Sequence, residues 1–242
     1  MSFKYHEPCP RCGSKDNRAV YDDGHTWCFG CSKWTPPDGM SMKYLEHQLN
    51  QQVKGVGGIE FPPDFTPHIP KEALKWIKQY GITNEELSNN HIGWSNSRSM
   101  LIFPFYGDKD ELQIWQGRYF PKQNPKVFTE GERERFILLP SITSKLEDDS
   151  RLVVVEDPVS SIKVSRYVRC SPLMGASLSQ QKAIRIAKEY SHLSIWLDFD
   201  KIDMMMKFTE MYRSLFDNID FIVTEKDPKD LTDNDIKEKL DG

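Results

Sequence analysis

The last third of the chain alternates short apolar runs with charged, helix-forming segments, and this alternation restricts the fold more than any other feature. Within residues 151–155 a continuous apolar run follows Arg151, and apolar runs recur in 194–197 and 221–223 after helical stretches. Continuous apolar runs are typical of strands buried on both faces, and strands that alternate with helices indicate a mostly parallel sheet. The sequence therefore predicts an α/β fold for residues 151–242.

Acidic residues follow three of these predicted strands. Glu156 follows the first, Asp198 and Asp200 follow the second, and Asp227 or Asp230 follows the third. Parallel strands end on the same edge of a sheet, where ligands bind, so these acids should converge. On a strand, Asp198 and Asp200 share one face, and neighbouring carboxylates repel unless a cation lies between them. We expect a divalent-metal site; the alternative is that Asp200 caps the next helix and Asp198 lies in solvent.

Four of the five cysteines lie within the first 31 residues. They form two C-x2-C pairs separated by fifteen residues, at Cys9, Cys12, Cys28 and Cys31. This spacing is that of a zinc ribbon, whereas a disulfide framework would spread its cysteines along the chain. A module of about 38 residues buries too little apolar surface to fold without its metal. We therefore predict structural zinc in residues 1–38.

The segment between the cysteine pairs carries a turn signal and aromatic rings. Asp23-Gly24 predicts a hairpin turn, with His25, Trp27 and Trp34 on or beside the hairpin. Nearby cations complete a set of stacking faces and phosphate partners that suits single-stranded nucleic acid. These cations are Arg11, Lys15, Arg18 and Lys33. The alternative is that the two tryptophans form the small core of the ribbon.

Residues 39–58 contain a Gly-rich stretch that predicts a linker, and residues 59–150 predict a mixed α/β region. The expected elements are a helix over 70–80, a capping box at Thr83 with Glu86, and strands over 100–105, 113–119 and 136–139. Arg118, Lys122 and Lys126 lie close together between two of these strands. They could hold phosphate groups, or form an ordinary solvated loop.

Composition sets broader limits. The formal net charge is −4, so total charge gives no indication of nucleic-acid binding. The first seven residues lack the apolar core of a signal peptide, and no apolar run approaches about 20 residues. We expect a soluble, cytoplasmic protein without a membrane span.

Two parts of the sequence carry a resemblance. Glu156 after its strand, Gly175, Asp198-x-Asp200 and the segment 226–228 resemble the TOPRIM domain shared by primases and topoisomerases. Residues 23–34 resemble the zinc-binding domain of bacteriophage primases, closest to the primase half of phage primase–helicases. The resemblance implies a zinc ribbon followed by an RNA-polymerase-type primase domain, with an N-terminal subdomain over 59–150 and a TOPRIM subdomain over 151–242.

The resemblance also implies residue roles. Cys9, Cys12, Cys28 and Cys31 would bind one zinc ion, and Asp23, His25, Trp27 and Trp34 would help to read the template and hold the primer. Arg118, Lys122 and Lys126 would contact nucleotide phosphates or template. Glu156, Asp198, Asp200 and Asp227 would bind one or two Mg²⁺ or Mn²⁺ ions, and Glu156 could instead act as a general base.

The implied activity is the synthesis of short RNA primers on single-stranded DNA from ribonucleoside triphosphates, in a phage-infected bacterial cell. The implied partners are a DNA polymerase and a separate helicase, since the sequence contains no G-x-x-x-x-G-K-[ST] loop. The resemblance implies further acids at two positions occupied here by Pro158 and Ser160, which leaves open how a second metal ion is held. Two other classes fit the same features: a TOPRIM nuclease and a non-catalytic zinc-ribbon DNA-binding adaptor.

Overall fold

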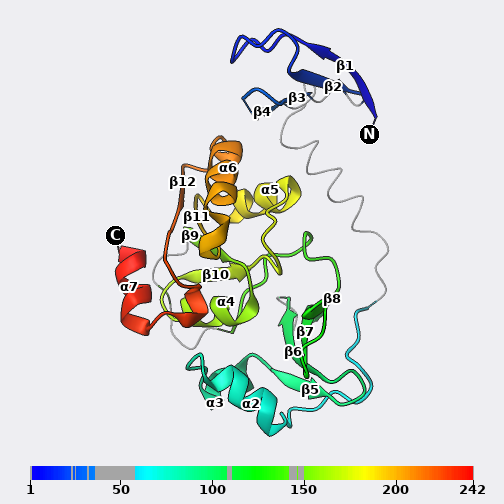
Figure 1. Ribbon diagram of the computed structural model, residues 1–242, viewed down its shortest axis with the longest axis vertical. Helices are drawn as coiled ribbons and strands as arrows, with labels where there is room; N and C mark the ends of the chain where they lie inside the picture. The colour runs from blue at the N-terminus through cyan, green and yellow to red at the C-terminus, as the bar shows by residue number, and fades with distance from the viewer. Residues whose placement is uncertain are drawn as a thin grey trace. The chain divides into compact units, whose positions relative to one another are not determined.

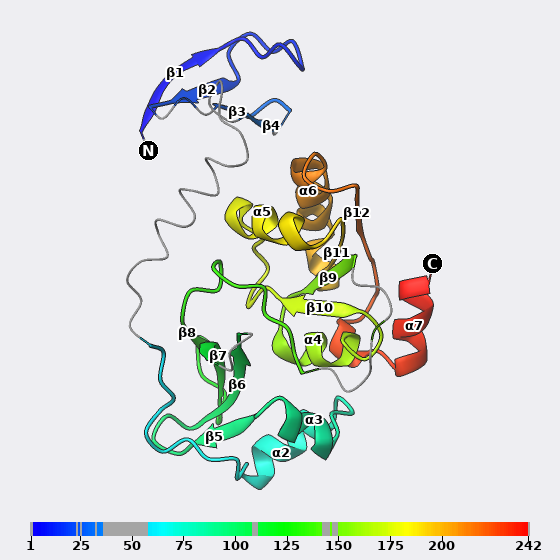
Figure 2. The ribbon, with the colours of Figure 1, turned by 180° about the vertical axis from the view of Figure 1, so that it is seen from behind.

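The computed structural model describes residues 2–22, 24, 26–31, 33–35, 58–107, 111–141, 146 and 150–241. The chain forms two compact units, Met1–Val56 and Gly57–Gly242, which are drawn in Figures 1 and 2. The predicted linker lies outside the described residues, apart from Gly58. The domain limits at residues 38, 58 and 150 stay predictions. Among the described helices, none is long and apolar enough to cross a membrane.

The first unit is a small antiparallel sheet in the order β1-β2-β3-β4. Its strands are β1 (Phe3–Glu7), β2 (Arg18–Tyr21), β3 (Thr26–Cys28) and β4 (Lys33–Thr35). β2 and β3 pair as the expected hairpin, with Ala19 opposite Trp27. Gly24 has a φ of 86° in the connecting turn, a conformation that glycine adopts without a steric penalty. The buried apolar residues described in this unit are few: Cys9, Ala19, Val20 and Cys28.

The second unit begins with two helices and an antiparallel sheet in the order β5-β6-β7-β8. These elements are α2 (Lys71–Lys78), α3 (Asn84–Asn89), β5 (Gly93–Ser95), β6 (Met100–Tyr106), β7 (Leu112–Tyr119) and β8 (Val127–Glu130). The expected capping box is present, because Glu86 N–H donates to Thr83 Oγ1 (3.0 Å) and Thr83 N–H donates to Glu86 Oε2 (2.8 Å). The helix over 70–80 and the first two strands expected here are also confirmed.

The strand expected over 136–139 is wrong, and β8 was not expected. Residues 136–139 form a connection outside any sheet, and burial of their side chains holds it in place. Leu138 is fully buried in one core, whereas Ile137 and Leu139 pack against the next core. The Leu138 N–H donates to Ser171 Oγ (3.1 Å) instead of to a strand partner. The apolar pattern therefore reflects burial between two cores.

The rest of the second unit is a parallel sheet in the order β10-β9-β11-β12, flanked by helices. Its strands are β9 (Arg151–Val155), β10 (Arg169–Pro172), β11 (His192–Trp196) and β12 (Asn218–Phe221). Its helices are α4 (Pro158–Val164), α5 (Gln180–Glu189), α6 (Ile202–Tyr212) and α7 (Asp233–Asp241), with 3₁₀ turns at Phe199–Lys201 and Pro228–Asp230. The predicted alternation of strands and helices is confirmed.

Helices cover both faces of the parallel sheet. α5 and α6 lie on one face and α4 and α7 on the other, as both views show. Alternate residues of β9 enter the two cores, Leu152 and Val154 on the α5 and α6 side, Val153 and Val155 on the α4 and α7 side. This two-sided burial explains the continuous apolar run in the sequence.

Helix α4 joins the two halves of the second unit. Its residues Val159 and Ile162 pack in the same core as Ile77 of α2 and Phe103 of β6. Because α4 starts at the carboxyl edge of the parallel sheet, the shared core holds the antiparallel sheet beside that edge. Side chains from β7 can therefore face the acids that follow β9 and β11.

Candidate functional site

Three of the four predicted metal-binding acids line one cleft at the carboxyl edge of the parallel sheet. Glu156 directly follows β9, Asp198 follows β11, and Asp227 precedes the last 3₁₀ turn. The cleft has a volume of about 350 Å³, and Arg118 and Lys126 also line it. Acids that follow separate strands thus converge as expected, with the exception of Asp200, and two cations of the β7–β8 segment line the same cleft, which the sequence analysis did not predict.

Two carboxylate oxygens in this cleft are buried without a donor. Within the described part of the chain, neither Glu156 Oε2 nor Asp198 Oδ1 accepts a hydrogen bond. Burial, opposed by the charge of Lys229 and reinforced by the acids Glu156, Asp227 and Asp157, raises the pKa of Asp198 to about 7. Burial and the adjacent Asp157 likewise raise the pKa of Glu156.

Unpartnered, half-buried carboxylate oxygens are costly unless a cation meets them. Hard divalent cations such as Mg²⁺ take oxygen ligands of this kind. The residues present therefore fit a divalent ion at Glu156 and Asp198.

The geometry expected for Asp200 is wrong. β11 ends at Trp196, and the chain turns into the 3₁₀ helix Phe199–Lys201, so Asp198 and Asp200 do not share a strand face. Asp200 is exposed, contacts the Lys201 ammonium and is absent from the cleft lining. It does not cap α6 either, because the residue before that helix is Lys201. A direct role for Asp200 at the metal stays a prediction.

Asp157 and Lys229 belong to the same cleft, and the sequence analysis did not assign them. Asp157 caps α4 and accepts from Val159 N–H (2.9 Å), Ser160 N–H (3.1 Å) and Ser160 Oγ (2.8 Å). The Lys229 ammonium donates to Asp227 Oδ2 (2.7 Å) and lies 3.2 Å from Asp157 Oδ2. Burial lowers the pKa of Lys229, but Asp157, Asp227 and Asp198 outweigh it and raise the pKa overall.

This cap explains the residues that depart from the implied pattern. Pro158 is the first residue of α4, where its missing N–H costs nothing, and Ser160 is buried beneath the Asp157 carboxylate. The pattern Asp-Pro-x-Ser is a helix-start signal that could have identified this role.

The basic residues divide into two groups. Arg118 and Lys126 line the cleft, and the Arg118 guanidinium stacks over the Trp76 ring at 4.3 Å from its centroid. Lys122 is exposed in the loop between β7 and β8 and is absent from the lining. The cleft therefore contains two cations as well as the acid cluster, with an aromatic surface beside one of the cations.

The four cysteines of the first unit form a second candidate site. Their sulfur atoms all lie within 4.8 Å of one another, with Cys9 Sγ 3.8 Å from Cys31 Sγ and Cys12 Sγ 3.7 Å from Cys28 Sγ. Burial alone raises the pKa of the Cys28 thiol, but the N–H groups of Cys31 and Gly30 and the neighbouring thiols lower it to about 6. Four converging sulfurs, one a thiolate near neutral pH, fit a tetrahedral Zn²⁺ ion.

The other predicted ribbon residues are placed only in part. Asp23 and His25 lie outside the described residues, and so does the side chain of Trp34. Trp27 stands on β3 opposite Trp34 and is half-buried. Exposed rings that the sequence analysis missed lie on this unit: Phe3, Tyr5 and Phe29, the last 61% exposed. Two of them alternate along β1, a pattern that could have been found in the sequence.

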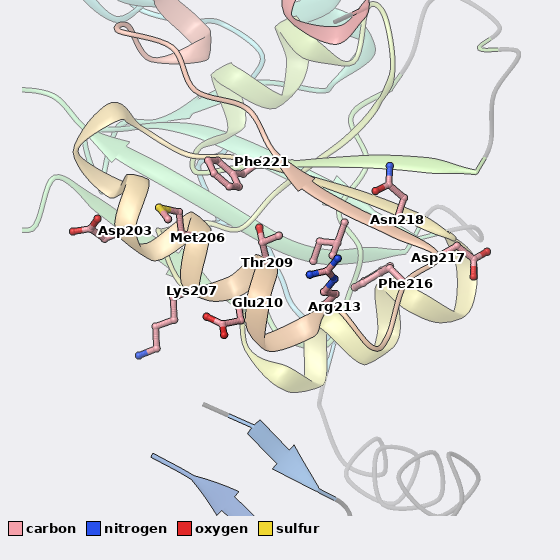
Figure 3. Close-up of a pocket in the computed structure, with 11 residues that line it drawn as sticks. Asp203, Met206, Lys207, Thr209, Glu210, Arg213, Phe216, Asp217, Asn218 and Phe221 are labelled. Carbon is pink, nitrogen blue, oxygen red and sulfur yellow. The ribbon is translucent and has the colours of Figure 1, made fainter. Parts of the chain in front are cut away.

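A larger depression of about 790 Å³ lies between α6 and β12 (Figure 3). Charged residues of alternating sign line its α6 side, with Asp203, Lys207, Glu210 and Arg213 following one another along the helix. It shares no residue with the acid cleft, and these four charged residues are all exposed. The acid cleft is the better candidate for chemistry.

Known proteins agree with this architecture. No protein-family model matches the chain. A DNA helicase/primase of Enterobacteria phage T3 is 53% identical over 34 residues, which are 14% of this chain and 6% of that protein. The chain therefore matches only a small part of that relative's length.

Solved structures match over nearly the whole chain. The primase fragment of the bacteriophage T7 primase-helicase has a TM-score of 0.52 and 17% identity, covering 99% of this chain and 98% of that one. The Aquifex aeolicus primase, comprising zinc-binding and RNA polymerase domains, has a TM-score of 0.54 and 13% identity, covering 100% and 79%. This chain has the DNA primase fold. The resemblance expected from the sequence is thus confirmed for the fold.

Proposed function

We propose that this chain is a DNA primase that synthesises short RNA primers on single-stranded DNA from ribonucleoside triphosphates. One observation carries the proposal: two donor-free carboxylate oxygens, of Glu156 and Asp198, lie in the same cleft as the cations Arg118 and Lys126. A polymerase that joins nucleotides needs this combination, a place for a divalent ion next to groups that hold phosphates.

Each residue has a proposed role. Glu156 and Asp198 hold a Mg²⁺ or Mn²⁺ ion, and Asp227 supports the same cluster. When bound, this ion would lower the pKa of the attacking 3′-hydroxyl and neutralise charge on the triphosphate. Arg118, held flat by its stacking on Trp76, positions phosphates or template, and Lys126 adds a second positive charge. Lys122, on the exposed loop between β7 and β8, contacts phosphates that lie outside the cleft.

The four cysteines hold a structural zinc ion, and the ribbon they organise binds template. Its exposed rings and cations suit unpaired bases. Asp23, His25, Trp27 and Trp34 contribute to this reading of the template. The proposed partners are single-stranded DNA, a helicase and a DNA polymerase, in a phage-infected bacterial cell.

A priming assay tests the proposal. The zinc-loaded protein is incubated with single-stranded templates, the four ribonucleotides and Mg²⁺ or Mn²⁺, and the products are resolved by length. Asp198→Ala should reduce primer synthesis by about a hundredfold or more, the scale of losing a preorganised charge at a reacting centre. Asp203→Ala, which removes an exposed acid from α6 outside the cleft, should leave synthesis unchanged.

Other outcomes would replace the proposal. Degradation of labelled DNA with metal but without nucleotides would indicate a nuclease that uses the same acids. Tight DNA binding without any metal-dependent chemistry would indicate an adaptor. Primer synthesis that persists in Asp198→Ala would show that the acid cleft is not the active site.

A further inference from the structure

The acid cleft already contains one cation that belongs to the chain. The Lys229 ammonium lies between the carboxylates of Asp157 and Asp227, 3.2 Å from Asp157 Oδ2 and 2.7 Å from Asp227 Oδ2. Its side chain is 18% exposed, so it is largely withdrawn from solvent. An ammonium at hydrogen-bonding distance from two carboxylates neutralises charge as a bound cation would.

Each carboxylate that meets this ammonium is carried by an anchored segment of the chain. Asp157 is held by three hydrogen bonds from the first turn of α4. Asp227 begins the last 3₁₀ turn, which closes when the Asp230 N–H donates to the Asp227 carbonyl (2.8 Å).

The backbone of Lys229 is fixed as well. Lys163 of α4 is 5% exposed, and its ammonium donates to the carbonyls of Lys229 (2.8 Å) and Leu231 (2.5 Å). This buried lysine ties the segment that carries Lys229 to the same helix that Asp157 caps. The fold therefore anchors the backbone that carries Lys229, and the side chain itself is largely withdrawn from solvent.

The remaining acids of the cleft are left for an ion from solution. Glu156 Oε2 and Asp198 Oδ1 are buried and meet no donor among the described residues, in contrast to the Asp157 and Asp227 oxygens that meet Lys229. The cluster thus has two parts: Asp157 and Asp227, which contact an ammonium of the chain, and Glu156 and Asp198, each of which has a buried oxygen without a donor.

We propose that Lys229 takes the place of a second metal ion, so that the cleft binds one divalent ion, at Glu156 and Asp198. This inference rests on the proposed function, in which the cleft binds a catalytic ion. Lys229 is then a positioning residue, because it orients Asp157 and Asp227 and balances their charge without coordinating the ion itself.

Counting bound Mn²⁺ tests the inference without measuring activity. Free Mn²⁺ is followed by electron paramagnetic resonance as it is titrated into the full-length, zinc-loaded protein without nucleotide. The wild type should bind one ion per chain. Lys229→Met, which keeps the length of the side chain and removes its charge, should bind two. Lys239→Met removes an exposed cation from α7 and should still bind one.

Each result has a distinct meaning. Two ions in the wild type would overturn the role of Lys229 and leave the proposed metal site intact, and this count needs no variant to fold. One ion in a folded Lys229→Met protein would also overturn it. No ion in the wild type would overturn the metal site itself, and with it the proposed function. Asp198→Asn should abolish binding in the wild-type background if the ion lies where we place it.

Discussion

At the scale of single residues, the acid cleft shows a conflict between function and stability. Asp198 has a buried oxygen without a hydrogen-bond donor and three acidic neighbours that raise its pKa. Burial and charge repulsion therefore make the ionised Asp198 carboxylate unfavourable in the free protein. Such an arrangement persists in a fold when a ligand compensates for it. Substituting a residue that destabilises the free protein in this way commonly stabilises the fold and lowers the activity.

We expect Asp198→Asn to stabilise the protein when divalent ions are chelated. The folded pKa of Asp198, about 7, lies above its unfolded value of about 4, so this group favours the folded state at low pH and opposes it as pH rises toward 7 and beyond. At pH 8 the variant should be more stable by about 1 kcal/mol, a value reduced because the carboxylate is only half-buried.

Thermal unfolding in a metal chelator, measured from pH 5 to 8, checks this expectation. The difference between variant and wild type should shrink as pH falls. A variant that is less stable at pH 8 would mean that Asp198 has a compensating partner in the free protein.

At the scale of elements, Arg166, which follows the end of α4, joins helices α3 and α7 and the turn at Gly81, all distant from it in sequence. Its Nε donates to Glu86 Oε1 (2.6 Å) of α3, and its guanidinium also donates to Asp233 Oδ1 (2.6 Å) of α7 and to the carbonyl of Gly81 (3.0 Å). Burial would raise the pKa of Glu86, but Arg166 and the Thr83 N–H lower it overall. A charged network of this kind fixes the helices around α4, and α4 in turn carries Asp157.

Arg166→Ala should lower the free energy of unfolding by about 3 kcal/mol, because it leaves the Glu86 carboxylate buried without its partner. Urea unfolding measures the change. The matched control is Arg213→Ala. Arg213 is an exposed arginine directly after α6, so its removal should change the free energy of unfolding by less than about 0.5 kcal/mol. Equal effects of the two variants would show that Glu86 finds other donors.

At the scale of the whole molecule, the two compact units differ in what can stabilise them. The second unit contains extended apolar cores around both of its sheets, whereas the first buries few apolar residues among those described. Small modules with so little core depend on a metal or on disulfides. The five cysteines are all free, and four of them converge.

Removal of zinc should therefore unfold the first unit and spare the second. Hydrogen exchange followed by mass spectrometry should show full loss of protection over β1–β3 after chelation, with protection of β9 and β11 retained. Cys28→Ser should have the same effect, whereas Cys170→Ala, which alters a fully buried cysteine of the second unit, should keep its zinc content. Retained protection over β2 and β3 in the chelated protein would mean that the ribbon folds without metal.

The sequence by itself determined what depends on local pattern. Cysteine spacing located the thiol cluster, continuous apolar runs located the buried strands, and Thr83 with Glu86 located a helix start, because each of these signals is contained in a short stretch of chain. The order of strands and helices then predicted that Glu156, Asp198 with Asp200, and Asp227 or Asp230 would meet at one edge, and Glu156, Asp198 and Asp227 do line one cleft.

The tertiary structure alone decided what depends on contacts between distant segments. It placed Lys229 between Asp157 and Asp227, moved Asp200 out of the cleft by ending β11 at Trp196, and turned the apolar run over 136–139 into a connection between two cores. The physical reason is the same in each case. Whether a charged side chain meets a partner, or an apolar run is buried by a sheet or between cores, is set by segments that no local pattern records.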